Sequence, residues 1–123
     1  MKVYKVIRRQ RGFLFSVNAP VDAQLVYHVG TWIRPKEGCG PLVAFKDLEV
    51  AISFVEYHFP KRAHGFRGEY WDVYEAEAKP WNQKLPRFKN HVVWLWSPTE
   101  FLPIEPGSRI ALCREIKLLK KVY

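Results

Sequence analysis

Two carboxylates in one strand-like run have the residue types needed for acid–base chemistry. Glu75 and Glu77 lie in the partly alternating segment 70–78, and alternate residues of a strand point to the same face. Carboxylates placed in this way can serve as an acid and a base, or one of them can bind a ribose hydroxyl. A solvated strand face opposite a basic neighbour also accounts for the pair, and we favour that structural explanation.

Tryptophans and basic residues in the second half of the chain offer a binding chemistry instead. The chain has five tryptophans, and aromatic rings that stack on bases beside cations that contact phosphates are typical of sequence-tolerant single-strand binders. Tryptophan and arginine are also the residue types of protein–protein hot spots. Burial of Trp94 and Trp96 in the core is an alternative of at least equal weight. The candidate binding residues are Trp81, Lys84, Arg87, Lys89, Trp94 and Trp96.

The spacing of the histidines, cysteines and glycines gives little support to metal, thiol or phosphate-loop chemistry. No histidine or cysteine stands at a metal-ligand spacing, so we predict no metal site. Gly38-Cys39-Gly40 precedes a proline and a strand rather than opening a helix, which indicates a tight turn and not a dinucleotide fingerprint. We therefore expect no cofactor. Because Cys39 and Cys113 are far apart, two reduced, buried thiols are favoured over a disulfide.

The charge of the chain is basic and arranged in blocks. Twenty basic residues against twelve acidic ones give a net charge of +8, which makes nucleic acid or an acidic protein the default partner. An acidic strip from Glu69 to Glu77 stands between basic segments at 1–20, 61–68, 79–89 and 109–121. Opposite charges on neighbouring strands stabilise a sheet. We weight pairing of these blocks within the fold slightly above a basic surface that faces a partner.

Strands around one helix are expected to position these residues. The runs 2–8 and 13–17 flank Gly12 and predict a hairpin. Further strands are predicted at 24–29, 42–45, 70–78 and 91–96. Apolar residues recur at helical spacing over 47–58, where Asp47 is a suitable N-cap and Pro60 ends the helix.

The last third of the chain is harder to assign. Five of the nine prolines fall between residues 80 and 106, so we expect most of that span to be loop. The segment 109–123 fits either a strand or a helix, and we choose a strand. As a strand it would place Ile110, Leu112, Ile116 and Leu118 on one face.

Several of these segments follow one another in an order that resembles a known family. They are Tyr4-Lys5-Val6, Val29-Gly30-Thr31-Trp32, the strand from Pro41 to Phe45 with the helix from Asp47 to Phe59, and Val73-Tyr74-Glu75-Ala76-Glu77. This layout resembles the core of small ADP-ribosyltransferase-like domains. The resemblance implies a split β-barrel, NAD binding in active members and a catalytic glutamate, for which Glu75 or Glu77 would stand. His28 and Arg8 are the candidates for the residue that holds NAD.

These features predict a single α+β domain over residues 1–123, with a curved, mostly antiparallel sheet or partial β-barrel and one main helix at about 47–58. No apolar run is long enough to span a bilayer and the N-terminus lacks signal-peptide features, so we expect a cytoplasmic protein. We favour a non-enzymatic interaction protein that binds an acidic partner through a basic, aromatic surface. The alternative is an ADP-ribosyltransferase-like enzyme, or an inactive relative, with Glu75, Glu77 and His28 as catalytic candidates. A homo-oligomer is compatible with either function.

Overall fold

The computed structural model describes residues 1–17, 24–59, 63–64, 68–84, 87–88, 91–97, 100–103 and 109–123, and for 63–64, 87–88, 91–97 and 100–103 the description covers the backbone alone. Within these residues the strand pairs are antiparallel. The elements follow in the order β1 (Lys2–Gln10), β2 (Phe13–Phe15), β3 (Val26–Tyr27), β4 (Trp32–Ile33), β5 (Leu42–Phe45), α1 (Leu48–His58), β6 (Ala63–His64), β7 (Glu69–Pro80), β8 (Arg87–Phe88), β9 (His91–Ser97), β10 (Glu100–Pro103) and β11 (Ile110–Lys121).

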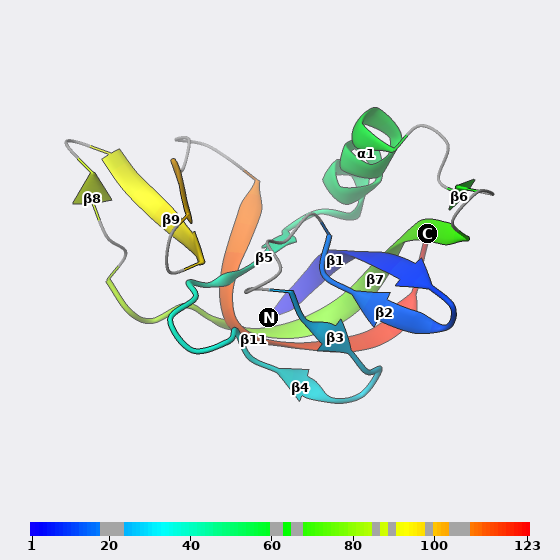
Figure 1. The fold of residues 1–123 in the computed structure, drawn as a ribbon, viewed down its shortest axis with the longest axis horizontal. Coiled ribbons are helices and arrows are strands. Elements are labelled where there is room, and N and C mark those ends of the chain that lie inside the picture. The colour runs from blue at the N-terminus through cyan, green and yellow to red at the C-terminus, as the bar shows by residue number, and fades with distance from the viewer. Residues whose placement is uncertain are drawn as a thin grey trace.

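Four strands close into a ring at the centre of the molecule (Figure 1). β1 pairs with β7 along its whole length, β7 pairs with β11, and β11 pairs with β5. β5 then returns to β1 through the pair Tyr4 and Phe45. The expected α+β fold with a partial barrel and one helix is therefore confirmed.

The interior of the ring is packed with small and aliphatic side chains. The diameter of a barrel grows with its number of strands, so a four-stranded ring has little room inside. Alanines at positions 44, 76, 78 and 111 accordingly face the interior, together with Val3, Ile7, Ile116 and Leu118. Tyr27 of β3 is the largest of the fully buried side chains and fills the remaining space.

On the side of the ring between β1 and β11, different strands occupy the two ends. β5 lies between β1 and β11 at one end. At the other end β2 and β3 extend the sheet from β1, while β4 pairs with β11. The loop from β3 to β4 joins the two edges, because the Gly30 amide donates a hydrogen bond to the Leu118 carbonyl at 2.8 Å. Gly30 has φ +83°, a conformation that glycine adopts without penalty.

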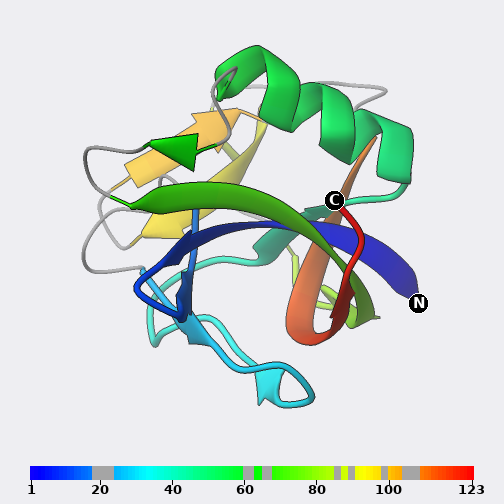
Figure 2. The same cartoon turned by 90° about the vertical axis from the view of Figure 1, so that its right-hand side faces the viewer.

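Helix α1 covers the outer face of the ring and forms a second core there (Figure 2). Phe59, just past the helix, stacks on Trp71 with ring centroids 4.6 Å apart. Burial of one aliphatic side chain such as valine contributes about 1.5–3 kcal/mol. Burial of a few such residues is therefore enough to hold the helix in place. The buried residues of this second core are Val6, Ala51, Val55, Trp71 and Val73.

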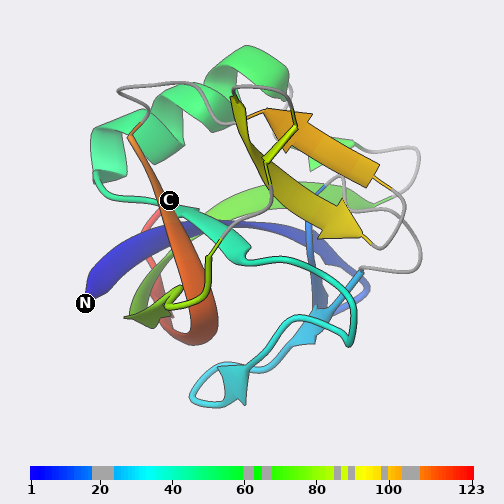
Figure 3. The ribbon, with the colours of Figure 1, turned by 90° about the vertical axis from the view of Figure 1, so that its left-hand side faces the viewer.

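A separate three-stranded sheet, β8–β9–β10, lies to one side of the ring (Figures 1 and 3). It occupies the proline-rich span where we expected mostly loop, although the strand at 91–96 was predicted. Two of its prolines are described and lie at the ends of strands, since β7 ends at Pro80 and β10 ends at Pro103. Proline lacks an amide donor, and the end of a strand is where that loss is tolerated.

Two local predictions need correction. Asp47 precedes α1 as expected, but its carboxylate makes no capping hydrogen bond and instead binds Arg109. The strand at 110–121 is confirmed, and its expected inward face is correct for Ile116 and Leu118 but wrong for the first half, where Ala111 and Cys113 face the core rather than Leu112. A register irregularity between Cys113 and Glu115 shifts the alternation by one residue, so that Ile116 and Leu118 also face inward.

Candidate functional site

The structure places Glu75 and Glu77 on the outer face of β7 and pairs each with a cationic group. Lys2 Nζ lies 2.6 Å from Glu75 Oε1, and Lys120 Nζ lies 3.6 Å from Glu75 Oε2. The hydrogen bond from Lys2, with the charge of Lys120, lowers the pKa of Glu75. Glu77 lies 3.4 Å from the Met1 nitrogen. Both carboxylates thus act as ion-pair partners of neighbouring chain segments.

Pairing of the charge blocks continues at Asp72, whose side chain is 3% exposed. Arg9 Nε lies 2.8 Å from Asp72 Oδ2, and Lys121 Nζ lies 3.6 Å from Asp72 Oδ1. The acidic strip on β7 is therefore neutralised by the basic strands β1 and β11 on either side. Pairing within the fold, to which we gave slightly more weight, is confirmed for these residues.

The residues proposed to hold NAD make no described contact with the two candidate glutamates, although Arg8 is the cross-strand partner of Trp71 on β7. His28 is exposed in the segment after β3, where its carbonyl accepts a hydrogen bond from Thr31. Arg8 lies over the Phe15 ring, with Cζ 4.6 Å from the centroid, and donates to Gln10. Among the described contacts, none joins His28 or Arg8 to Glu75 or Glu77.

Two of the six candidate binding residues can be placed. Trp81 is half-buried, and its indole nitrogen has no hydrogen-bond partner among the described residues. Lys84 is exposed. The remaining four, Arg87, Lys89, Trp94 and Trp96, lie outside the residues whose side chains are described, so their grouping on one surface stays a prediction.

A different tryptophan lies in a basic, aromatic surface. Trp32 of β4 is 36% exposed, and its ring centroid lies 4.6 Å from Lys79 Nζ and 5.0 Å from Lys117 Nζ. Lys117 is the cross-strand partner of Trp32 on β11, and Lys79 is on β7, the next strand. We name the group Trp32, Arg34, Lys79, Glu115 and Lys117 the Trp32 platform.

Glu115 holds the basic side chains of the Trp32 platform in place. Its Oε1 accepts a hydrogen bond from Arg34 Nε at 3.0 Å, and its Oε2 lies 3.0 Å from Lys79 Nζ. Glu115 is 8% exposed, and the hydrogen bonds from Lys79 and Arg34 lower its pKa. Because Lys79 also lies over Trp32, one ionised carboxylate holds Arg34 and positions Lys79 over the ring.

The sequence analysis missed the Trp32 platform because its members come from strands far apart in the chain. Lys79 and Lys117 belonged to charge blocks in the sequence, and only the pairing of β4 with β11 and of β11 with β7 brings them to Trp32. The local signal was the alternation Trp32-Ile33-Arg34, which places the first and third side chains on one face.

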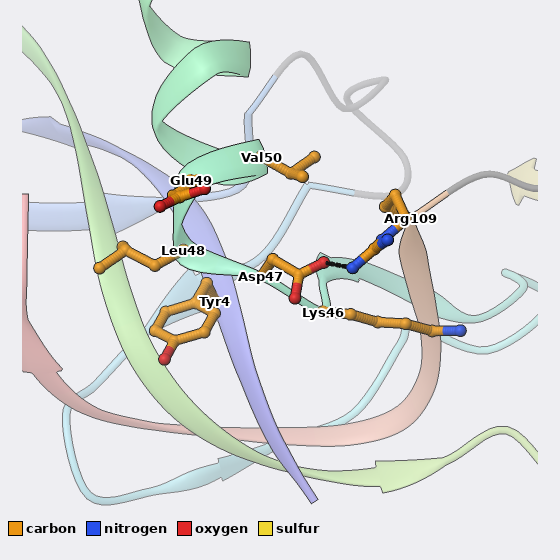
Figure 4. Close-up of a pocket in the computed structure, with 7 residues that line it drawn as sticks. All are labelled: Tyr4, Lys46, Asp47, Leu48, Glu49, Val50 and Arg109. Carbon is orange, nitrogen blue, oxygen red and sulfur yellow. Dashed lines mark hydrogen bonds and ion pairs between the residues drawn. The ribbon is translucent and has the colours of Figure 1, made fainter.

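A pocket of about 550 Å³ lies at the start of α1. Figure 4 shows Asp47 and Arg109 turned toward each other across it, with Tyr4 of β1 below and Lys46 extending outward. None of the candidate catalytic or binding residues lines it. Its two cationic and two anionic side chains, the other anion being Glu49, leave no net preference for an acidic ligand.

Lys5 brings an amine into the ring interior. Lys5 Nζ donates to the Val43 carbonyl at 2.6 Å and lies 5.9 Å from the Tyr27 ring centroid. Removal from water lowers the pKa of Lys5 to about 8. Burial also raises the pKa of the Cys113 thiol to about 11, so this thiol is protonated and unreactive at neutral pH. Both cysteines are thiols, and Cys39 is half-buried whereas Cys113 is buried.

Comparisons with known proteins give no family for the chain. No protein-family model matches it, and neither the curated proteins nor the solved structures include a significant match. In the part of the chain that is described, no helix is long and apolar enough to cross a bilayer. Nor do three histidine, cysteine, aspartate or glutamate side chains group there to hold a metal ion.

Proposed function

We propose that this protein is a non-enzymatic interaction protein that binds an acidic partner through the Trp32 platform. The observation that supports this most directly is an exposed tryptophan with two ammonium groups within 4.6 and 5.0 Å of its ring centroid. Arg34, whose side chain is 78% exposed, adds a third cation at the edge. Three cations against one buried carboxylate give the platform a positive field that attracts anions.

The ring of Trp32 is available to a partner on energetic grounds. An exposed cation–π contact contributes about 0.5–1 kcal/mol, whereas stacking of a nucleobase on an aromatic side chain contributes about 1–3 kcal/mol. A planar group can therefore displace a lysine from the ring. The displaced ammonium, still attached to the same surface, is then free to contact an anionic group of the partner.

The alternative of an ADP-ribosyltransferase-like enzyme has less support. It requires a glutamate free to act in a cleft with a polar residue of the first or third strand. Glu75 is 14% exposed and is held by two lysines, and the pocket at the start of α1 includes neither Glu75 nor Glu77. The enzyme stays a prediction, and the interaction function is the one that we propose.

A titration with two polyanions tests the proposed function. Fluorescein-labelled oligothymidylate and polyglutamate would be titrated with the protein at about 50 and 200 mM salt, with anisotropy as the readout. We expect at least one of the two polyanions to bind, and we expect its affinity to fall as salt rises. Trp32→Leu and Lys117→Gln should each weaken that binding roughly tenfold, since each removes a stacking or charged contact.

Lys46→Gln is the matched control for charge. Lys46 is exposed beside the start of α1 (Figure 4), on the side of the molecule opposite β4 in Figure 1. This variant loses the same charge as Lys117→Gln and should bind as the wild type does. Equal weakening by both variants would mean that net charge alone accounts for binding. Absence of binding to either polyanion at low salt would end the proposal.

A further inference from the structure

We propose that the acidic partner is a single-stranded nucleic acid, and that the strand runs from the Trp32 platform across β3 to the hairpin of β1 and β2. This inference depends on the function proposed above and adds both the chemical class of the partner and a second contact surface. That second surface consists of Arg8, Arg11, Phe13, Phe15 and Val26, and we name it the hairpin surface.

Strand register places most of the hairpin surface on one face of the sheet. Arg8 pairs with Phe15, and Phe15 pairs with Val26, so the three side chains form a row across β1, β2 and β3. The Arg8 guanidinium lies over the Phe15 ring at 4.6 Å. Phe13 is 56% exposed and lies 6.2 Å from Phe15 between ring centroids. An uncovered aromatic ring beside a guanidinium can stack on a base while the cation contacts a phosphate.

Arg11 occupies a position that is unfavourable for its residue type. It forms the two-residue turn of the hairpin with Gly12, and the φ values of +52° and +82° are those of a type I′ turn. Asparagine is favoured over arginine at the first position of this turn, because its short polar side chain tolerates the left-handed conformation. Retention of a guanidinium there at a cost in stability points to a role for its charge.

The described path between the two surfaces is short and exposed. Residues 28–32 are exposed, including Val29 between β3 and β4. Among the described residues, the segments from Gln24 to Lys36 and from Met1 to Val17 contain no acidic residue. Val26 and Trp32 are six residues apart, a span of at most about 20 Å. A strand of a few nucleotides is therefore long enough to reach both surfaces along these segments.

The form of these surfaces favours nucleic acid over an acidic protein. Anchor residues of protein partners insert into well-packed pockets, and none of the residues of the two surfaces lines the pocket described at the start of α1. Trp32 and Phe13 present ring surface beside cations, and stacking of a base needs only one face of a ring. Two such rings, on β4 and on β2, suit a partner whose planar groups repeat along a charged backbone.

Oligothymidylates of two lengths distinguish the contributions of the Trp32 platform and the hairpin surface to binding. We expect a strand of about ten nucleotides to contact both surfaces and one of about three nucleotides to be held at the Trp32 platform alone. Phe13→Leu should then weaken binding of the longer strand roughly tenfold and leave that of the shorter one unchanged. Arg11→Asn should reduce the slope of log affinity against log salt by about 0.7 for the longer strand, because one phosphate contact is lost.

Misfolding cannot explain these outcomes. Arg11→Asn improves the turn and should raise the melting temperature while it weakens binding. Tyr57→Leu is the matched control for Phe13→Leu, because Tyr57 is 82% exposed on α1, and it should bind both strands as the wild type does.

Three results would overturn the inference and would also show whether the proposed function survives. If the hairpin variants bind the longer strand as the wild type does while Trp32→Leu weakens it, the path is wrong and the Trp32 platform stands. If polyglutamate binds at the platform and oligothymidylate does not, the partner is an acidic protein. If neither polyanion binds, both proposals fail.

Discussion

Lys5 shows how a single residue can place a charge in the interior of a small barrel. Its neighbours on β1, Val3 and Ile7, face the ring interior, so strand alternation carries Lys5 inward as well. The amine is satisfied by the Val43 carbonyl at 2.6 Å. Burial nevertheless disfavours the charged form and lowers the pKa of Lys5 to about 8.

The lowered pKa predicts a specific dependence of stability on pH. The unfolded chain releases the Lys5 proton near 10.5 and the folded protein near 8, so between these values the unfolded state holds more protons. The free energy of unfolding should therefore rise with pH across this window, by at most about 3 kcal/mol. Below pH 8 the folded state carries the full cost of the buried charge.

Urea unfolding of the wild type and of Lys5→Met at pH values from 7 to about 11 measures this effect. The difference between the two proteins should shift in favour of the wild type between pH 8 and 10.5. Cys113, whose pKa is raised to about 11, acts in the opposite direction but is present in both proteins. A difference that does not change with pH would show that the Lys5 amine is solvated.

At the scale of elements, the segment from β3 to β4 bridges the two sheet edges beside the closed ring. The hydrogen bond from Gly30 to Leu118 connects it to β11. Space around Gly30 is open, so an added methyl group meets no neighbour within 4 Å. The cost of a side chain there comes from the backbone, since φ is +83°.

Gly30→Ala should therefore lower the free energy of unfolding by about 1–2 kcal/mol and loosen this side of the ring. Cys113 is fully buried in the interior, so its rate of reaction with a thiol reagent reports the opening. In a Cys39→Ser background we expect Gly30→Ala to raise that rate several-fold under native conditions. Unchanged labelling with lowered stability would show that the segment does not control access to the interior.

The sequence predicted some elements well because their signals are local. The helix was found from the spacing of its apolar residues and from Asp47 and Pro60 at its ends. The hairpin was found from Gly12 between two strand-like runs. The inward face of β11 was missed because the irregularity after Cys113 depends on pairing with β7, and nothing in the segment itself marks it.

The Trp32 platform was missed for the same kind of reason. Trp32, Lys79 and Lys117 meet through two strand pairings that bring together distant parts of the chain. The candidates near Trp94 were chosen because basic residues stand beside them in sequence, which is a local signal. Surfaces of β-proteins are assembled from strands that are distant in the sequence. The spacing of residues along the chain therefore does not reveal which of them share a surface.

At the scale of the whole molecule, ion pairs join the strands of the ring. Asp72 and Glu75 connect β7 to β1 and β11, and Glu115 connects β11 to β7 and to the segment after β4. The pKa values of Glu75 and Glu115 are lowered by their cationic partners. The folded state therefore binds protons less readily at these sites than the unfolded chain does.

Acid should weaken the protein through these sites. Their contribution to the free energy of unfolding is present above the ordinary glutamate pKa of 4.5. It is lost as pH falls through the lower pKa values that these glutamates have in the folded protein. The melting temperature should drop between about pH 5 and pH 3, and Glu115→Gln should make that drop smaller. Glu37→Gln, at an exposed turn residue, should leave the drop unchanged, and an equal effect of both variants would assign the acid sensitivity to net charge.

The closed ring also has a consequence for biosynthesis. During translation β1, β5 and β7 leave the ribosome before β11, which pairs with both β5 and β7. Until residues 110–121 emerge, these strands keep unpaired backbone edges that can pair with another chain. The nascent chain is thus exposed to such pairing until β11 has emerged, and only then does the closed ring protect the backbone edges of the other strands.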